Sequence, residues 1–372
     1  MKRTREKAAE RDAWRKWWLT PEELDHYGIR HDPERWAHYL GFAAWSRVVR
    51  RPLSDPKTAA IADNKWLFHH YYGSQGFPLP AALGLVHPIY GAMLDGTPCR
   101  NLVDLVRWLH LSRTSSFVVK PLAGWNSEGL VVCSNVNWDD AGWMFETPEG
   151  WLSHQEFQRR VALNFRGTAG CVVQERCHPA AGLRELGLCQ PSAVRIVVFM
   201  PESGTPEVHA AVLFVGRERA MVNSWTKGAI SIPIEPRSGR LGSGRTLPSF
   251  GTSALTHHPD SDERFEGRIL PGWSDARSVA LRASCATPNL RLVCWELLLT
   301  DGGAKLLEAN LGFGLTMLQV HTEGFLKDGT AKRWAEAGAE LPDGTTSWGR
   351  PGWGSRVYRK VGRLAQRGMR RL

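Results

Sequence analysis

Residues 290–310 read LRLVCWELLLTDGGAKLLEAN, two apolar stretches that flank a turn with adjacent glycines. Apolar segments on either side of an Asp-Gly-Gly turn predict a β-hairpin. If the loop has three residues, Glu296 lies directly opposite Glu308, and Asn310 shares their face. A two-residue turn would instead place Glu296 opposite Leu307.

The facing carboxylates need a compensating charge. Like charges directly opposite each other repel, so carboxylates embedded among leucines and valines need a proton or a cation between them. Two carboxylates and an amide oxygen form a hard, oxygen-only ligand set that suits Mg²⁺, which usually completes its shell with water and nucleotide phosphate. The pattern therefore predicts a magnesium site made by Glu296, Glu308 and Asn310. The alternative is a polar hairpin edge that faces solvent.

A second informative stretch, residues 117–132, reads FVVKPLAGWNSEGLVV. Lys120 ends an apolar strand, and a loop containing Gly124 and Ser127 precedes the next strand. Backbone N–H groups in such a loop, together with a fixed lysine, can bind phosphate oxygens. The stretch lacks the spacing of a Walker loop or of a dinucleotide fingerprint, and a lysine that ends a strand is often simply solvated.

The rest of the chain mixes helical and strand patterns. Thr20-Pro21-Glu22-Glu23 predicts a helix start with a capping box, and the tryptophans of the first 45 residues predict a packed apolar stripe. Helices are also predicted over residues 65–72, 154–165 and 276–284, and strands over 117–120, 130–133, 171–175, 194–200, 208–215, 230–234, 290–299 and 304–310. Many links are too short for a crossover helix, so we expect an α+β fold with largely antiparallel sheets.

Composition narrows the class of protein. The chain has 372 residues, 42% of them hydrophobic, and a net charge of +10. The positive charge lies at the ends: residues 350–372 contain eight bases and no acid, and residues 2–18 contain seven bases and three acids. A body close to neutral argues against nucleic acid as a partner.

Cellular location and membrane contact follow from the same composition. Seven scattered cysteines, a charged N-terminus and the absence of a long apolar run favour a cytoplasmic protein without signal peptide or membrane span. The basic tail has apolar residues at helical spacing. It suits an amphipathic helix on an anionic membrane or carrier, a segment docked on the protein's own body, or a solvated tail.

Short motifs then follow one another in a family-specific order. They are Asp63-Asn64-Lys65 with Gly76-Phe77-Pro78-Leu79-Pro80, Val119-Lys120-Pro121, Val172-Val173-Gln174-Glu175, Ala193-Val194-Arg195-Ile196, Val222-Asn223 before Lys227-Gly228, His258-Pro259-Asp260, and Trp295-Glu296 with Leu307-Glu308-Ala309-Asn310. In this order, over about residues 60–325, the chain resembles the ATP-grasp superfamily, most closely its sugar-transfer-associated branch. The resemblance implies two α+β lobes whose antiparallel sheets clamp ATP.

The resemblance also implies a set of functional residues. The nucleotide-binding residues would be Lys65, Lys120, Gly124, Ser127, Gln174, Glu175, Arg176 and Cys177. The two lysines would grip the phosphates, and main-chain groups of Arg176 and Cys177 would meet the adenine at a hinge near residues 172–178. Glu296, Glu308 and Asn310 would hold one or two Mg²⁺ ions. Lys120 and Arg195 would be catalytic, Arg195 facing the transferred phosphate or an acyl-phosphate oxygen.

Other interpretations stay open at this point. Arg195 could be an ordinary surface pair on an edge strand, and Lys65 could serve solubility. Family members commonly have Asp at the position of Glu296, smaller residues in the phosphate loop, and a complete α/β domain before the first lysine.

The expected organisation has three parts: a helical N-terminal segment at residues 1–58, an ATP-grasp domain at 59–330, and a basic extension at 331–372. The expected activity is an ATP- and Mg²⁺-dependent ligase that joins small-molecule carboxylate and amine substrates through an acyl phosphate. The alternatives are a small-molecule or glycan kinase on the same scaffold and a non-catalytic nucleotide-binding module.

Overall fold

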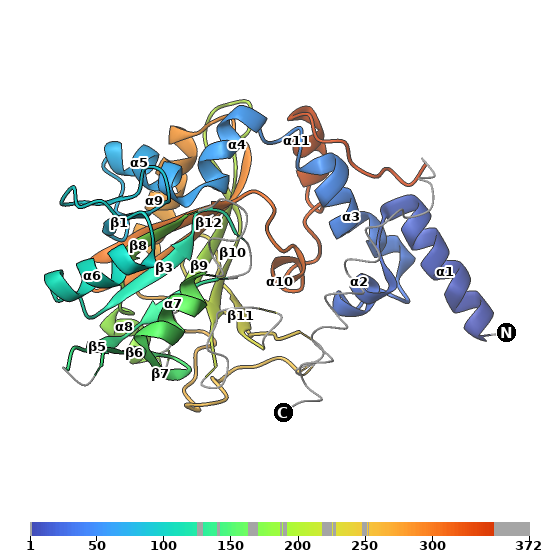
Figure 1. Cartoon of the computed structure of the whole chain (residues 1–372). Helices are drawn as coiled ribbons and strands as arrows, with labels where there is room; N and C mark the ends of the chain where they lie inside the picture. Colours follow the sequence, from blue (N-terminus) through green and yellow to red (C-terminus); the bar gives the residue numbers. More distant parts are fainter. Residues whose placement is uncertain are drawn as a thin grey trace.

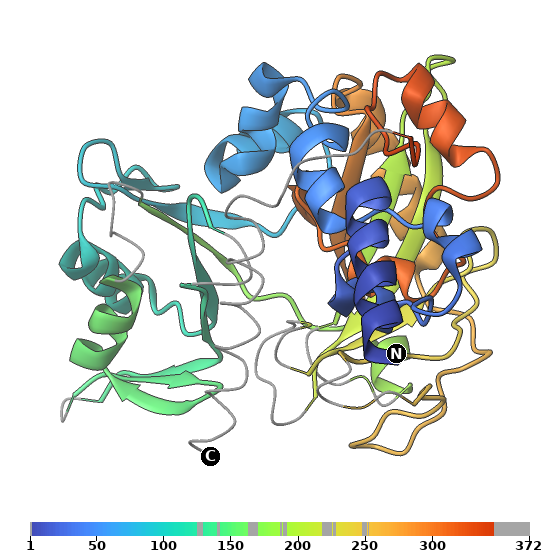
Figure 2. The same cartoon turned by 90° about the vertical axis from the view of Figure 1, so that its right-hand side faces the viewer.

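The computed structural model describes residues 2–124, 129–139, 142–162, 170–186, 188, 192–217, 225, 228–247, 251 and 253–345. Within them lie two five-stranded sheets and one three-stranded sheet, and every strand ladder is antiparallel. The two large sheets belong to two lobes that stand side by side (Figures 1 and 2). The expected α+β fold with antiparallel sheets is confirmed.

The N-terminal segment is helical. It contains α1 (Lys2–Trp17), α2 (Pro21–His26), the 3-10 helix η1 (Pro33–His38), α3 (Phe42–Ala44) and the π-helical turn η2 (Trp45–Val49). The predicted capping box opens α2: the Thr20 hydroxyl accepts from the Glu23 N–H, and the Glu23 carboxylate accepts from the Thr20 N–H. Buried Trp18 and Trp45 pack with Phe313 and Trp334, which confirms an apolar stripe for these tryptophans.

The first sheet has the strand order β2-β1-β8-β3-β4. Its strands are β1 (Ala82–Val86), β2 (Ala92–Met93), β3 (Phe117–Pro121), β4 (Val131–Cys133) and β8 (Cys171–Glu175). Helices α6 (Leu102–Ser112) and α7 (His154–Ala162) cover one face, because Leu105, Leu109 and Phe157 pack with Phe117 and Val119. A small sheet of β5 (Asn135–Asn137), β6 (Met144–Thr147) and β7 (Gly150–Ser153) completes this lobe.

The opposite face of the first sheet carries Lys120. Lys120 is the register partner of Val172, and Val172 packs with Leu122 and with Trp66 of α5 (Lys65–Ser74). Since side chains alternate along a strand, Lys120 points away from α6 and α7. The first lobe therefore turns its lysine face toward α5, whose Phe68 and Tyr72 pack in the core of the second lobe.

The second sheet has the strand order β11-β10-β9-β12-β13. Its strands are β9 (Ser192–Phe199), β10 (Glu207–Val215), β11 (Ile230–Pro233), β12 (Leu292–Thr300) and β13 (Gly303–Asn310). Helix α9 (Trp273–Ala286) covers one face, with α4 (Pro56–Asp63) and α5 beside it (Figure 1). The N-terminal helices, α10 (Thr316–Gln319) and α11 (Thr330–Glu336) cover part of the other face.

The β12–β13 hairpin pairs Glu296 with Glu308, as predicted, but for a different reason. Thr300 pairs with Gly303, so the turn has two residues, Asp301 and Gly302. The register then shifts between Glu296 and Leu297, which makes Leu307 the extra residue of a β-bulge. The bulge restores the opposition of the two carboxylates that a two-residue turn alone would remove.

The bulge also decides which way Glu308 faces. Ala304 and Leu306 pack into the core beneath α9, and uninterrupted alternation would send Glu308 into that same core. After the bulge Ala309 takes the core position instead. Glu308 therefore shares the outer face with Glu296 and with Cys294.

No helix among the described residues is long and apolar enough to span a membrane. The basic tail, residues 346–372, lies outside the described residues.

Candidate active site

Two carboxylates and an amide lie together on the outer face of the β12–β13 hairpin. Glu296 and Glu308 are direct register partners, and their side chains are 13% and 30% exposed. The Asn310 amide Nδ2 donates to Glu308 Oε1 at 3.0 Å and to Glu296 Oε2 at 3.5 Å. The structure thus brings together the three residues expected to bind magnesium.

Three basic side chains from separate segments surround this pair. Arg195 of β9, the register partner of Glu296, places Nη2 3.0 Å from Glu296 Oε2. Lys65, at the start of α5, places Nζ 3.6 Å from Glu308 Oε2. The ammonium of Lys120, in the first sheet, is within electrostatic reach of both carboxylates. The site is therefore built by both lobes.

The start of α5 fixes Lys65 relative to the first lobe. The Asn64 side chain caps this helix by accepting from the Trp66 and Leu67 N–H groups, as the residue before a helix commonly does. The Lys65 N–H donates to the Leu122 carbonyl at 2.9 Å, just beyond β3. This hydrogen bond holds Lys65 close to the end of β3, the strand that carries Lys120, so the two predicted phosphate-binding lysines lie in the same region.

The two carboxylates differ in their proton affinity. Burial raises the pKa of Glu296 to about 7, and the nearby Glu308 charge adds to this, while Arg195 acts against it. Burial also opposes the charge of Glu308, but Lys65, the Asn310 amide and Arg195 outweigh it and lower its pKa. Without a metal ion, Glu308 is the more firmly ionised of the two.

The cations show the same balance between burial and pairing. Burial lowers the pKa of Lys120, with a further contribution from the like charge of Lys65, although Glu308 opposes the shift. Burial disfavours the Arg195 charge as well, but Glu296 outweighs it, and the pKa of Arg195 is raised.

One N–H donor of Arg195 has no hydrogen-bond partner among the described residues. This donor, Nε, is buried, and the guanidinium lies 5.2 Å from the centre of the Phe214 ring. A buried donor without a partner costs about 1–3 kcal/mol. Because this atom is enclosed by protein, a ligand oxygen could reach it only after the side chain or its neighbours moved.

The donor set also fits magnesium. Carboxylate oxygens are hard ligands that suit Mg²⁺. Among the described residues, no cluster of three or more His, Cys, Asp or Glu is placed to hold a metal ion. Asn310 presents its NH₂ group to both carboxylates, so it could join the set only after its amide turns to present the oxygen.

The residues expected to line the adenine lie where the chain leaves the first sheet. Gln174 is buried within β8, Glu175 ends that strand, and Arg176 and Cys177 follow it, each partly exposed. The Glu175 carboxylate pairs with Lys305 of β13, a residue that no sequence motif indicated. Hydrogen bonds from Lys305 and from the Ala81 N–H outweigh burial and lower the pKa of Glu175.

Lys305 could not be recognised from strand alternation. It is an odd number of residues from Glu308, and an uninterrupted strand would put the two on opposite faces. Lys305 is paired with Leu298 in the regular register set by the turn, and the bulge at Leu307 then brings Glu308 onto the same face as Lys305.

The phosphate loop is described only in part. Lys65 Nζ donates to the Gly124 carbonyl at 3.4 Å, so the first residue of the expected loop lies beside the site. Ser127, with Trp125, Asn126 and Glu128, lies outside the described residues, as do Val222, Asn223 and Lys227.

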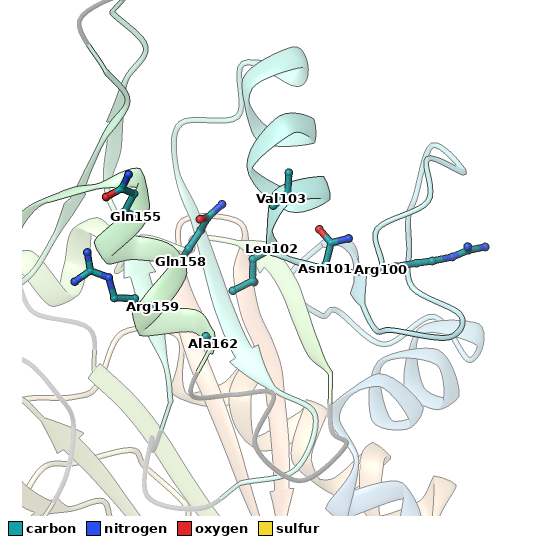
Figure 3. A pocket seen from close by; sticks show the side chains of 8 residues that line it. All are labelled: Arg100, Asn101, Leu102, Val103, Gln155, Gln158, Arg159 and Ala162. Carbon is teal, nitrogen blue, oxygen red and sulfur yellow. The ribbon is translucent and has the colours of Figure 1, made fainter.

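A groove of about 590 Å³ between α6 and α7 is separate from this site (Figure 3). Its lining includes Leu102, Val103, Gln155 and Gln158, and the Arg100 side chain points away from α7. The groove lies on the face of the first sheet opposite Lys120, so it makes no contribution to the carboxylate cluster.

Two lobes built on antiparallel sheets, with a carboxylate pair on one and basic side chains from separate segments beside it, are the arrangement expected of an ATP-grasp protein. The model of the family described as "Sugar-transfer associated ATP-grasp" matches residues 46–332, and the chain belongs to that family. No curated protein matches the chain.

Several solved structures resemble the chain at low identity. A D-cycloserine synthetase is 14% identical with a TM-score of 0.38, and the match covers 77% of this chain and 72% of that one. N5-carboxyaminoimidazole ribonucleotide synthetase in complex with ADP is 12% identical with a TM-score of 0.42, over 79% of this chain and 56% of that one. The D-alanine-D-alanine ligase from Coxiella burnetii is 12% identical with a TM-score of 0.38, over 85% and 61%. This chain thus spans less than two thirds of the length of the last two.

Proposed function

We propose that the chain is an ATP- and Mg²⁺-dependent ligase that activates a substrate carboxylate as an acyl phosphate and joins it to an amine. Membership of the ATP-grasp family supports nucleotide use. The observation that carries the proposal is the convergence of Arg195, Lys65 and Lys120, from three separate segments, on the opposed carboxylates Glu296 and Glu308.

Each group has a role in this scheme. Glu296 and Glu308, with Asn310 after its amide turns, would hold Mg²⁺, which would supply positive charge to the phosphate oxygens. Lys65 and Lys120 would bind those oxygens from the two lobes. Segment 174–177 would form the hinge that holds the adenine, and the basic tail would contact a carrier or membrane.

Arg195 would bind the oxygens that change charge during the reaction. A substrate carboxylate oxygen attacks the γ-phosphorus of ATP, the bond to the bridging oxygen breaks, and ADP leaves with that electron pair. The amine nitrogen then attacks the acyl carbon, phosphate leaves, and the amine proton passes to solvent. The protein supplies position and charge rather than a nucleophile, which is the usual division of labour in phosphoryl transfer.

The test is incubation with ATP, Mg²⁺ and pooled small carboxylic acids and amines, followed by measurement of ADP, phosphate and product mass. Equal amounts of ADP and phosphate with a new amide support the ligase. ADP with a phosphorylated product and no free phosphate would show a kinase instead. Absence of nucleotide turnover in every pool would contradict both and leave a binding module.

A further inference from the structure

Three donors converge on a single oxygen of Glu175. Glu175 Oε1 accepts from Lys305 Nζ, from the Ala81 N–H at 2.9 Å and from the Cys177 thiol at 3.8 Å. Glu175 Oε2 accepts from no described residue. The carboxylate is therefore held in one orientation with one oxygen left for another donor.

The pair joins the two sheets at the point where the chain crosses between them. Glu175 ends β8 of the first sheet, and Lys305 lies in β13 of the second. The segment that enters the first lobe, ahead of β1, is attached at the same place, because the Leu306 N–H donates to the Pro78 carbonyl at 2.7 Å. Both crossings between the lobes are thus fastened to β13.

After Glu175, the segment that crosses to the second lobe runs along the β12–β13 hairpin. The Ala180 N–H donates to the Leu299 carbonyl at 2.9 Å, and the Ala181 N–H donates to Asp301 Oδ1 at 2.6 Å. Arg184 also pairs with Asp301, at 3.4 Å. Residues 175–184 therefore pack along the hairpin that carries Glu296 and Glu308.

We propose that Lys305 is a positioning residue for nucleotide binding: by holding Glu175 against β13 it sets the nucleoside-binding segment at a fixed distance from the carboxylate pair. Lys305 itself contacts neither Glu296 nor Glu308. The inference rests on the proposed function, because it requires that residues 174–177 bind the nucleoside. The free oxygen of Glu175 would accept from a donor on the base or the ribose.

The charges of the pair agree with this role. Pairing with Glu175 outweighs burial and raises the pKa of Lys305, while the pKa of Glu175 is lowered. Both groups are charged at neutral pH, and charge-assisted hydrogen bonds are the stronger and more directional kind. A neutral side chain of the same length would leave Glu175 with only the Ala81 and Cys177 donors.

The experiment compares a ligand that has a nucleoside with one that lacks it. Dissociation constants for MgATP and for Mg²⁺-bound inorganic tripolyphosphate are measured by calorimetry on the full chain and on Lys305→Met, Lys305→Arg and Glu175→Gln. Lys332→Met is the matched control, since Lys332 is an exposed lysine on helix α11, an element separate from the β12–β13 hairpin. The melting temperature without ligand is recorded for each variant.

We expect Lys305→Met to weaken MgATP about tenfold, equivalent to ~1.4 kcal/mol, and tripolyphosphate less than about twofold. Lys305→Arg should restore most of the affinity, because it keeps the charge. The double variant with Glu175→Gln should bind no more weakly than the weaker single variant, because the two residues act as one unit.

Three results would overturn the inference. They are unchanged MgATP affinity in Lys305→Met, equal losses for MgATP and tripolyphosphate, and failure of Lys305→Arg to restore binding. A wild-type chain that binds neither MgATP nor tripolyphosphate would instead refute the proposed function, so the two failures are distinguishable.

Discussion

Replacement of Glu308 by Gln separates the role of this carboxylate in the ligand-free fold from its role in binding. In the ligand-free protein, two effects of the change oppose each other. The variant loses the pair with Lys65, whose two side chains are 21% and 30% exposed, and such partly exposed pairs contribute about 1 kcal/mol or less. The variant also relieves the repulsion between Glu308 and Glu296. The free energy of unfolding should therefore change by less than ~1 kcal/mol.

The effect on ligand-linked stability is larger. MgATP at a concentration of about 100 times its dissociation constant stabilises a protein by ~2.7 kcal/mol. For a chain of 372 residues, with an unfolding entropy of ~2.1 cal/mol/K per residue, this corresponds to a rise of about 3–4 °C in melting temperature. Because Glu308→Gln removes a carboxylate ligand of the proposed metal site, that rise should disappear.

Thermal unfolding with and without MgATP measures both effects in one assay. Glu207→Gln serves as the control, because Glu207 of β10 also pairs with a base, Arg333, through side chains that are 42% and 43% exposed. The control should keep the full rise. A Glu308→Gln protein that melts near the wild-type temperature and still gains 3–4 °C from MgATP would refute the metal-site argument.

Three further predictions concern other parts of the molecule. Burial raises the pKa of Glu23 to about 7, above its ordinary value, so its contribution to stability is complete below about pH 4.5 and is lost as the pH rises through 7. Between pH 5 and 8 the free energy of unfolding of the wild type, measured in urea, should fall by about 2–3 kcal/mol relative to that of Glu23→Gln. Parallel pH profiles of the two proteins would contradict this. Gly303→Ala should cost about 1–3 kcal/mol in the same assay, because φ is +98° and the new Cβ would lie 2.9 Å from Asp275 Oδ2; an unchanged unfolding midpoint would be the contrary result. Lys120→Met should weaken MgATP at least about tenfold by calorimetry without lowering the ligand-free melting temperature, since it removes a charge that burial disfavours; equal affinity would exclude Lys120 from the phosphate site.

The β12–β13 hairpin shows which structural features can be predicted from the sequence and which cannot. Its two apolar strands and its glycine turn were predictable from local pattern, and the opposition of Glu296 and Glu308 was expected from a three-residue loop. The assumed three-residue loop was wrong, because Asp275 of α9 accepts from the Ala304 N–H and holds a two-residue turn. The bulge at Leu307 compensates for the shorter turn, and neither feature is encoded in the alternation of the hairpin alone.

Elements with weak local patterns were missed. The strands β1 and β2 and the small sheet β5–β7 lie in the first lobe, where several exposed large apolar side chains blur the alternation. Helix α6 was missed as well, although the Asn101 side chain caps it by accepting from the Asp104 N–H. The convergence of Lys65, Lys120 and Arg195 is tertiary, and only the family resemblance anticipated it.

Charge balance connects the ligand-free site with its proposed ligands. Two carboxylates without a metal ion are tolerable here because Arg195 and Lys65 lie against them and Lys120 is near. The same three cations would bind phosphate oxygens once Mg²⁺ took over the neutralisation of Glu296 and Glu308. Mg²⁺ bound to the carboxylates would free the basic side chains from their pairing with Glu296 and Glu308. The phosphates of ATP would then compensate the excess positive charge. ATP and Mg²⁺ should therefore bind cooperatively, and the binding free energy should depend on Glu308 even though lysine and arginine would make the phosphate contacts.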